Sequence, residues 1–368
     1  MILPDINLAN IEGKRVFLRS DLNVPLSENL KIEDDTRLCA TLPTVKYLLS
    51  KASKVIIASH LGRPKGKDSN LSLLPIANWF KKQLAEDVSD LAVQNINGFD
   101  GWEITPKLFL LENLRFDSGE EDNSGDFAKK LASLADIYVN DAFGVAHREN
   151  ASVVGIAKYL PHFAGFLLQK EIGILSSILE NPKRPLVVIV GGAKIETKLP
   201  LIDKMDDFAD YVLVGGKIAA ETETLLNLQH EKRSTIRSTL LIAKLTEDGI
   251  DITKESVEYF LHRIELAKTV VWNGPVGKTE DGETASMGSK AIAEAILKSG
   301  AYSVVGGGDT LNFLKKEGLL DKFSFYSTGG GAMLAFLSGE TLPGLQALLS
   351  KFRPTSGGIF GRRGCNIR

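Results

Sequence analysis

The chain has 368 residues, of which 43% are hydrophobic and 24% are charged, and its formal net charge at pH 7 is -2. This length exceeds one ordinary hydrophobic core and predicts two domains, while the composition excludes a mainly disordered chain. The small net charge gives no overall field that would attract nucleic acid or an anionic membrane, so any anion site has to come from a local cluster.

Short runs rich in β-branched residues alternate with helix-length stretches along the chain. In the first half, strands are predicted at residues 15–18, 55–58, 107–111 and 137–139. In the second half, they are predicted at 186–190, 211–214, 269–272, 303–305 and 323–326. Continuous apolar runs separated by helices are typical of parallel strands covered on both faces. The predicted fold class is therefore α/β, with two doubly wound parallel-sheet (Rossmann-like) domains.

A segment with helical spacing lies between the two series of strands, and Asn181-Pro182 ends it. The expected organisation is an N-terminal domain at 1–165, a joining helix at 166–182, a C-terminal domain at 183–345 and a tail at 346–368. The last residues of this tail are basic and rich in glycine. We expect a cleft between the two domains and a tail that returns towards the N-terminal domain.

Basic and polar side chains directly follow the predicted strands of the first half. Ligands of open α/β sheets bind beyond the carboxyl ends of the strands. Following the strands are Asp21, Asn23, Arg37, His60, Arg63, Arg115, His147 and Arg148. Guanidinium groups match phosphate and carboxylate oxygens, so four arginines on one rim predict a site for a small, highly anionic ligand. Taken singly, each arginine is also consistent with a surface ion pair, and each histidine with a structural role.

Five glycine-rich turns follow the predicted strands of the second half. Glycine lets the backbone approach a ligand closely, and a helix that starts there points free N–H groups at an anion. The residues proposed from these turns are Gly192, Lys194, Gly215, Gly216, Asn273, Pro275, Gly307, Gly308, Asp309 and Thr310. One such turn is a weak signal, but five in one domain predict a phosphate cradle for a nucleotide.

Charged residues near these turns predict further contacts with the nucleotide. Lys194 and Lys198, four residues apart, are expected on one face of a helix, where both reach the phosphates. Asp309 lies in a phosphate-type turn, where a Mg²⁺ ligand is expected, and Glu280 is a candidate for a ribose hydroxyl. Neither GxxxxGK[ST] nor a GxGxxG turn after a strand occurs, which disfavours the ordinary P-loop and dinucleotide folds.

A series of longer motifs resembles the phosphoglycerate kinase family from Val16 to Leu348. These motifs are SDLNVP, SHLGRPKG, LLENLRF, YVNDAFGVAHR, GGAKIETK, TVVWNGPVG, VVGGGDT, STGGGA and LPG, in the family's order. The resemblance implies reversible transfer of the 1-phosphate of 1,3-bisphosphoglycerate to ADP, giving 3-phosphoglycerate and ATP, with Mg²⁺, in glycolysis and gluconeogenesis. Because the two half-sites are expected on separate domains, they have to close together, so we also expect hinge bending.

The resemblance assigns roles to the candidate residues. Phosphoglycerate is expected on Asp21, Asn23, Arg37, His60, Arg63, Arg115 and Arg148. The nucleotide and metal are expected on Lys194, Lys198, Asn273, Glu280, Gly308, Asp309 and Thr310. Arg37 and Lys198 are expected to contact the transferring group as catalytic residues. Since the accepting carboxylate is already ionised at pH 7, no general base is needed and catalysis reduces to alignment and charge stabilisation.

One segment departs from the family's pattern. Residues 227–268 are fewer than the family usually has there, so the strand and loop that enclose the nucleotide base are expected to be reduced or absent.

Two other functions stay open, a ligase that activates a carboxylate as an acyl phosphate and a non-catalytic sensor of nucleotides or anions.

The cellular setting follows from the cysteines and from the lack of long apolar runs. Cys39 and Cys365 are too few for a disulfide framework, and such usage suits a reducing compartment. No apolar run approaches the roughly 18 residues of a membrane span, and no export signal is visible. We therefore expect a cytoplasmic monomer with small-molecule substrates and without nucleic-acid or membrane partners.

Overall fold

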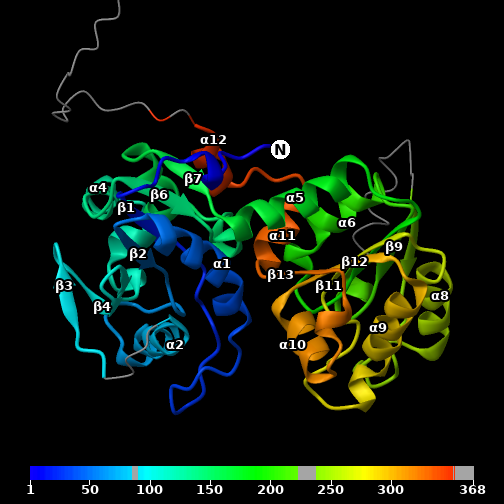
Figure 1. Ribbon diagram of the computed structural model, residues 1–368. Helices are drawn as coiled ribbons and strands as arrows, with labels where there is room; N and C mark the ends of the chain where they lie inside the picture. The colour runs from blue at the N-terminus through cyan, green and yellow to red at the C-terminus, as the bar shows by residue number, and fades with distance from the viewer. Residues whose placement is uncertain (85–89, 223–237, 351, 353–368) are drawn as a thin grey trace, which may run out of the picture. The chain divides into compact units, whose positions relative to one another are not determined.

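The computed structural model describes residues 1–84, 90–222, 238–350 and 352. These residues form two compact units, each built around a largely parallel sheet (Figure 1). The N-terminal unit contains residues 2–142, 148–169 and the described residues from 343 onward. The C-terminal unit contains Met1 and the described residues of 143–147 and 170–342. The α/β fold class is confirmed.

The sheet of the N-terminal unit has the strand order β3-β4-β5-β2-β1-β6-β7. Its parallel strands are β1 (Arg15–Arg19), β2 (Lys54–Ala58), β5 (Leu108–Leu111), β6 (Ile137–Asn140) and β7 (His162–Ala164). An antiparallel hairpin of β3 (Gln94–Ile96) and β4 (Phe99–Thr105) extends one edge. Because β1 pairs with both β2 and β6, the loops after these strands leave the sheet side by side.

Helices cover both faces of this sheet, which explains why its strands read as continuous apolar runs. On one face, Val16 and Leu18 share a core with Leu38 of α1 and Phe80 of α2. On the other face, the Tyr138 hydroxyl donates to the Ser152 carbonyl oxygen at 3.0 Å. The elements concerned are α1 (Thr36–Lys51), α2 (Leu74–Leu84), α3 (Ser118–Glu121), α4 (Gly125–Ala132) and the π-helix η5 (Ala151–Gly155).

The sheet of the C-terminal unit is parallel throughout its described strands, in the order β10-β9-β8-β11-β12-β13. Its strands are β8 (Leu186–Val190), β9 (Tyr211–Val214), β10 (Thr239–Ile242), β11 (Thr269–Asn273), β12 (Tyr302–Gly306) and β13 (Phe325–Ser327). All five strands predicted for the second half are therefore present, and β10 is additional.

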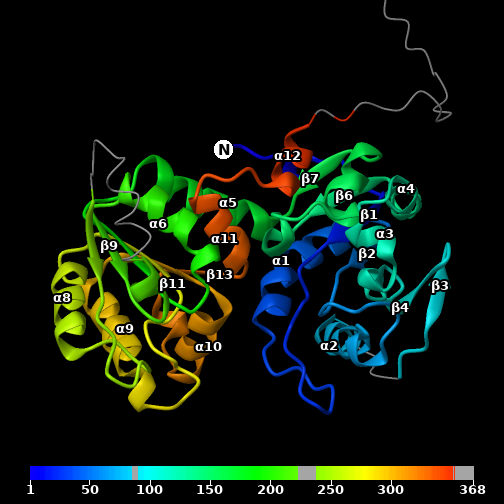
Figure 2. The same ribbon diagram turned by 180° about the vertical axis from the view of Figure 1, so that it is seen from behind.

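Two groups of helices cover the C-terminal sheet (Figure 2). The group of α8 (Lys254–Ile264), α9 (Met287–Ser299) and α10 (Gly308–Lys316) packs on one face, where Phe260, Ile292 and Phe313 join the core around Trp272. On the other side lie α5 (Phe166–Glu180), α6 (Leu199–Asp206) and α11 (Gly330–Leu337).

The chain passes from one unit to the other inside a helix. Helix α5 lies within the range predicted for the joining helix, and the division falls between Gln169 and Lys170. After the C-terminal unit, α12 (Pro343–Leu349) packs against β7 and η5 of the N-terminal unit. Most of the predicted basic tail, residue 351 and residues 353–368, lies outside the described residues.

Candidate functional site

An anion site in the N-terminal unit is favoured by the carboxyl ends of four neighbouring parallel strands, β5, β2, β1 and β6. The loop after β1 carries Asp21 and Asn23, and the loop after β2 carries His60. Arg115 follows β5, and Arg148 follows β6. Since parallel strands end at a common edge, the sheet itself gathers these loops.

Arg37 is tied to the loop after β1 by two hydrogen bonds. Its Nη1 donates to Asp21 Oδ2 at 3.0 Å and to the Asn23 carbonyl oxygen at 3.1 Å. The Asn23 side chain in turn accepts from the Gly62 N–H at 2.9 Å, which joins the loops after β1 and β2. Burial alone would raise the pKa of Asp21, but Arg37 first, then His60 and Arg19, bring the pKa below its usual value. Asp21 is therefore an ionised anchor that orients Arg37 and leaves its other N–H donors for a ligand.

Arg115 and Arg148 contribute positive charge beside His60. Arg115 Nη1 donates to the Gly62 carbonyl oxygen at 2.5 Å, and its Nε lies 3.2 Å from Glu121 Oε1. Burial and the charge of Arg148 lower the pKa of Arg115, and Arg148 also acts on the pKa of His60. Because these cations repel one another, an anion that binds among them lowers the electrostatic free energy of the cluster.

A fifth arginine, Arg19, belongs to this cluster although the sequence analysis missed it. It is the last residue of β1 and only 1% exposed, and its Nη2 lies 3.3 Å from His60 Nδ1. Burial, opposed by Asp21 and reinforced by Arg19, holds the pKa of His60 well below its ordinary value. The sequence feature that could have revealed Arg19 is a charged residue at the carboxyl end of a strand whose three central residues are apolar.

The remaining two predicted residues of this group are Arg63 and His147. Arg63 lies on the loop that carries His60, and its side chain is exposed. His147 belongs by its contacts to the C-terminal unit, where a Cβ added at Gly331 would stand 3.8 Å from His147 Cε1. By its contacts His147 is therefore assigned to a different unit from Arg148, which follows it directly in the chain.

The glycine-rich turns of the C-terminal unit meet around a hollow of about 270 Å³. Its wall includes the predicted residues Gly192, Lys194, Lys198, Asn273, Gly307, Gly308, Asp309 and Thr310. The first turns of α10 and α11, at Gly308 and Gly330, also contribute to the wall. Two helix N-termini and two lysines in one hollow provide the donors that phosphate groups require.

Glycine is required where these turns touch one another. Gly274 has φ +93°, and a Cβ there would stand 2.1 Å from the Gly191 carbonyl oxygen. A Cβ on Gly330 would stand 2.8 Å from Gly307 Cα. The hydroxyl of Thr310 accepts from the Gly274 N–H at 2.9 Å, so this predicted nucleotide ligand also fixes the turn. Backbone-to-backbone packing thus shapes the floor of the hollow.

Lys198 points into this region and donates from Nζ to Asn273 Oδ1. Burial lowers its pKa to about 8, against the opposing charge of Asp309. Lys194 and Lys198 flank the 3₁₀ turn η7 (Ile195–Thr197) instead of lying along one α-helix, so the predicted helical spacing is wrong although both line the hollow. Pro200 at the start of α6 is typical of a first helical turn, which explains why the α-helix begins only after Lys198.

A second hollow of about 250 Å³ shares Gly192, Ala193 and Asp309 with the first. The predicted residues Gly216, Pro275 and Glu280 line it, together with Leu245 and Ile250, which the sequence analysis missed. Gly215 does not line either hollow, because it packs against the Val276 side chain.

The described part of the shortened segment, where the strand and loop were expected to be reduced or absent, contains the strand β10. Strand β10 pairs in parallel with β9, and Leu245 and Ile250, which follow it, supply a wall of the second hollow. Residues 223–237 lie outside the described part of the chain.

A cation site built from protein side chains alone does not occur in the described residues, where no three His, Cys, Asp or Glu side chains gather. Asp309 is exposed in the first turn of α10 and lines both hollows. Mg²⁺ is usually held by one or two carboxylates and substrate phosphates, so a single carboxylate beside a phosphate cradle fits this ion.

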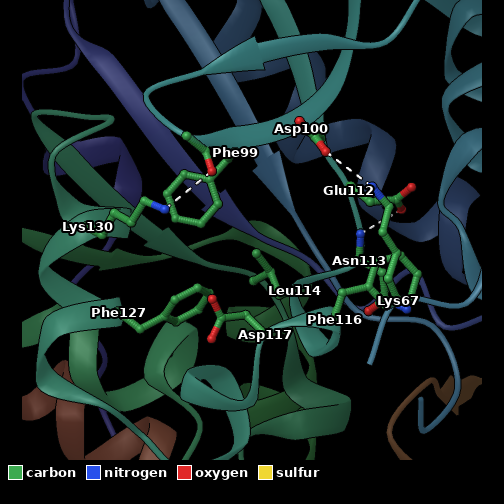
Figure 3. A pocket seen from close by; sticks show the side chains of 11 residues that line it. Lys67, Phe99, Asp100, Glu112, Asn113, Leu114, Phe116, Asp117, Phe127 and Lys130 are labelled. Carbon is green, nitrogen blue, oxygen red and sulfur yellow. Dashed lines mark hydrogen bonds and ion pairs between the residues drawn. The ribbon is translucent and has the colours of Figure 1, made fainter. Parts of the chain in front are cut away.

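A third hollow lies in the N-terminal unit, and Leu114 and Phe116, the neighbours of Arg115 in the chain, line it (Figure 3). Lys130 lies 4.6 Å from the centre of the Phe99 ring, and Lys67 pairs with Asp100 at 3.4 Å. Glu112 accepts from the Ser72 hydroxyl at 2.7 Å and from backbone N–H groups. These charged side chains are engaged with the protein itself, and no arginine is among the residues that line this hollow, so we assign the anion site to the arginine cluster instead.

Three comparisons with known proteins agree with this geometry. The family model described as phosphoglycerate kinase matches residues 6–234 and 221–340. A phosphoglycerate kinase of Leptospira biflexa is 40% identical over 95% of this chain and 99% of its own length. A cytosolic phosphoglycerate kinase of Triticum aestivum is 39% identical over 92% and 96% of the two chains. The solved phosphoglycerate kinase of Coxiella burnetii superposes with a TM-score of 0.78 at 34% identity, covering 95% of this chain and 99% of that one.

Proposed function

Because the chain belongs to the phosphoglycerate kinase family, we propose that it transfers the 1-phosphate of 1,3-bisphosphoglycerate reversibly to ADP, giving 3-phosphoglycerate and ATP in glycolysis and gluconeogenesis. The observation that carries this proposal is the presence of two different anion sites, one made of arginines and one made of glycine turns with lysines. Each has the charge that one of the two substrates requires.

The N-terminal cluster is the proposed site for phosphoglycerate. It consists of Asp21, Asn23, Arg37, His60, Arg115 and Arg148, to which we add Arg63 from the exposed part of the same loop. Several arginines fit a ligand that carries both a phosphate and a carboxylate. His147, which the contacts assign to the other unit, is proposed to act from there.

The two C-terminal hollows are the proposed nucleotide site. We place the phosphates among Gly192, Lys194, Lys198, Asn273, Gly307, Gly308 and Thr310, and the nucleoside between Gly216, Pro275 and Glu280. Asp309 would hold Mg²⁺ together with phosphate oxygens. When bound, this cation neutralises charge on those oxygens. Gly215 supports the site from outside the wall.

Catalysis is proposed to rest on alignment and charge stabilisation. In the direction that consumes ATP, the acceptor is an ionised carboxylate, which attacks without a general base. Arg37 and Lys198 are the proposed contacts of the transferring group. Backbone N–H groups at the starts of α10 and α11 add further donors.

Transfer also requires that both substrates meet away from water, so we expect hinge bending between the units. Small-angle scattering with both substrates bound should show a smaller radius of gyration than with either substrate alone. An unchanged radius would contradict hinge bending. We further propose a cytoplasmic monomer with small-molecule substrates and without nucleic-acid partners.

The reaction is tested by a coupled assay of ADP-dependent consumption of 1,3-bisphosphoglycerate, with and without Mg²⁺ and with GDP as a second nucleotide. Turnover without any amine present would separate the kinase from a carboxylate-activating ligase. Binding of both substrates without turnover would instead indicate a sensor. Asp309→Asn should raise the KM for Mg·ATP without changing the KM for 3-phosphoglycerate, whereas an equal effect on both would remove Asp309 from the proposed metal site.

A further inference from the structure

The contact between Arg19 and His60 fixes which ring nitrogen of the histidine carries the proton. Arg19 Nη2 lies 3.3 Å from His60 Nδ1. A guanidinium group has only N–H donors and no acceptor, so Nδ1 must accept and cannot carry a proton. In the neutral ring the proton then lies on Nε2. Among the described residues nothing hydrogen-bonds to Nε2, although the side chain is only 4% exposed.

Arg19 cannot turn away from His60, because its other nitrogens are occupied. Nη1 donates to the Ser20 carbonyl oxygen at 2.5 Å, and Nε donates to Ser152 Oγ at 2.7 Å. The Ser152 hydroxyl gives its own proton to Glu120 Oε1 at 2.5 Å, so it is free to accept from Arg19. Glu120 also accepts from the Ser152 N–H at 2.9 Å.

This buried relay joins three loops that carry arginines of the anion site. Glu120 lies on α3, shortly after Arg115, and is 1% exposed. Its main-chain oxygen accepts from the Asn150 side chain at 3.3 Å, shortly after Arg148. Its carboxylate lies 3.9 Å from Arg19 at the end of β1. Glu120 thus joins these three segments through its carboxylate and its main-chain oxygen.

We propose that His60 meets the anionic substrate as a neutral imidazole that donates a hydrogen bond from Nε2. Arg19 fixes this tautomer, and Ser152 and Glu120 are positioning residues that hold Arg19. The inference deepens the proposed phosphoglycerate site and rests on that function.

The charges around His60 favour a neutral donor over a cation. Arg19, Arg115 and Arg148 face it from the ends of β1, β5 and β6, and Asp21 is the opposing anion on the loop after β1. A protonated ring would add one more positive charge to a buried cluster of cations. A neutral Nε2–H still supplies a directed donor to a phosphate or carboxylate oxygen, and it selects the ligand by geometry.

The proton position is read directly by nitrogen NMR of the ligand-free protein. With only five histidines in the chain, ¹⁵N-histidine labelling gives a simple long-range ¹H–¹⁵N spectrum, and His60→Gln assigns the signals. We expect an acceptor-type shift at Nδ1 and a protonated, donor-type shift at Nε2 at pH 7. An imidazolium pattern, or a proton on Nδ1, would overturn the proposal while leaving the kinase reaction untouched.

Two substitutions of His60 separate the Nε2 donor from the rest of the ring. In His60→Gln the side-chain amide reaches the place of Nε2, whereas in His60→Asn it reaches only the place of Nδ1. We expect the KM for 3-phosphoglycerate to rise less than about threefold in the Gln variant and about tenfold or more in the Asn variant, as for one hydrogen bond to a charged group. The KM for ATP should stay constant in both. Equal losses in the two variants would contradict the Nε2 assignment.

Ser152→Ala tests the relay, because it removes the acceptor of Arg19 Nε and the donor to Glu120 together. We expect the His60 signals to shift towards a mixture of tautomers and the KM for 3-phosphoglycerate to rise, with the KM for ATP unchanged. Ser133→Ala is the matched control, since the Ser133 hydroxyl donates to the Lys130 carbonyl oxygen at the exposed end of α4. Unchanged His60 signals in Ser152→Ala would exclude the positioning role.

Discussion

Lys198 should cost the folded protein free energy at neutral pH, and Lys198→Met should recover part of it. Burial lowers the pKa of this lysine from 10.5 to about 8. At roughly 1.36 kcal/mol per pKa unit, this corresponds to about 3 kcal/mol at pH 7, and solvent screening of the partly exposed side chain reduces it to about 1–2 kcal/mol. The hydrogen bond to Asn273 is lost in the variant, which offsets some of this gain.

The pH dependence separates the two contributions. Because the folded-state pKa is the lower one, the unfolded chain binds more protons between about pH 8 and pH 10.5, and wild-type stability rises with pH through this window relative to the variant. The lost hydrogen bond contributes at every pH and cancels. We therefore expect the free energy of unfolding of Lys198→Met, minus that of the wild type, to fall by about 1 kcal/mol from pH 7 to pH 9.5.

Urea unfolding followed by ¹⁹F NMR of fluorotryptophan-labelled protein measures this difference in unfolding free energy for the C-terminal unit, which contains Lys198. Trp272 on β11 is fully buried in the C-terminal unit, so its resonance reports on the structure around Lys198. Lys194→Met, which removes an exposed lysine of the same loop, is the matched control. A difference that stays constant or grows with pH would refute the reasoning. Phosphoryl transfer should be lost at every pH in Lys198→Met.

Three further outcomes test other parts of the molecule. Arg37→Ala should lower kcat by at least about 10²-fold, as for one lost transition-state donor, and near-normal turnover would remove Arg37 from catalysis. Burial raises the pKa of Glu171 to about 7, so its stabilising contribution is lost as pH rises from about 4.5 through 7. In urea titrations, the free energy of unfolding of Glu171→Gln minus that of the wild type should accordingly rise by about 2–3 kcal/mol from pH 4.5 to pH 8. A difference that does not change with pH would contradict the burial of this charge. Gly274→Ala should weaken ADP binding at least about tenfold by calorimetry, because its Cβ meets the Gly191 carbonyl oxygen at 2.1 Å, whereas Gly300→Ala, also at positive φ but in open space, should not. Equal effects of the two alanines would exclude the contact as the cause.

The elements that sequence patterns predicted are those buried on both faces. Strands β2, β5, β8, β9 and β11 are largely continuous apolar runs, and β1 is one between its two terminal arginines. The hairpin of β3 and β4 was missed because β3 is polar and largely exposed at the sheet edge. Its turn carries Asn97-Gly98, both at positive φ, which is a hairpin signal that would have revealed it.

The site residues were predictable where strand ends position them and less so elsewhere. Arg115 follows a strand end as the sheet rule predicts, whereas Arg37 lies in the first turn of α1 and is joined to the loop after β1 by its hydrogen bond to Asp21. Arg19 was missed because it ends a strand predicted from its apolar residues, and its buried side chain contacts Ser152 and His60. His147 was grouped with Arg148 by adjacency in the chain, which fixes neither the contacts nor the unit of a side chain in an irregular segment.

The winding of the chain between its two units determines how the protein can be dissected. A gene cut between Gln169 and Lys170 would give a first fragment without α12 and a second fragment without residues 143–147. Neither product would therefore carry all of its own packing partners. A gene that deletes residues 170–342 and links residue 169 to residue 343 would restore α12 to the first fragment, and an autonomous phosphoglycerate-binding half should be sought from it.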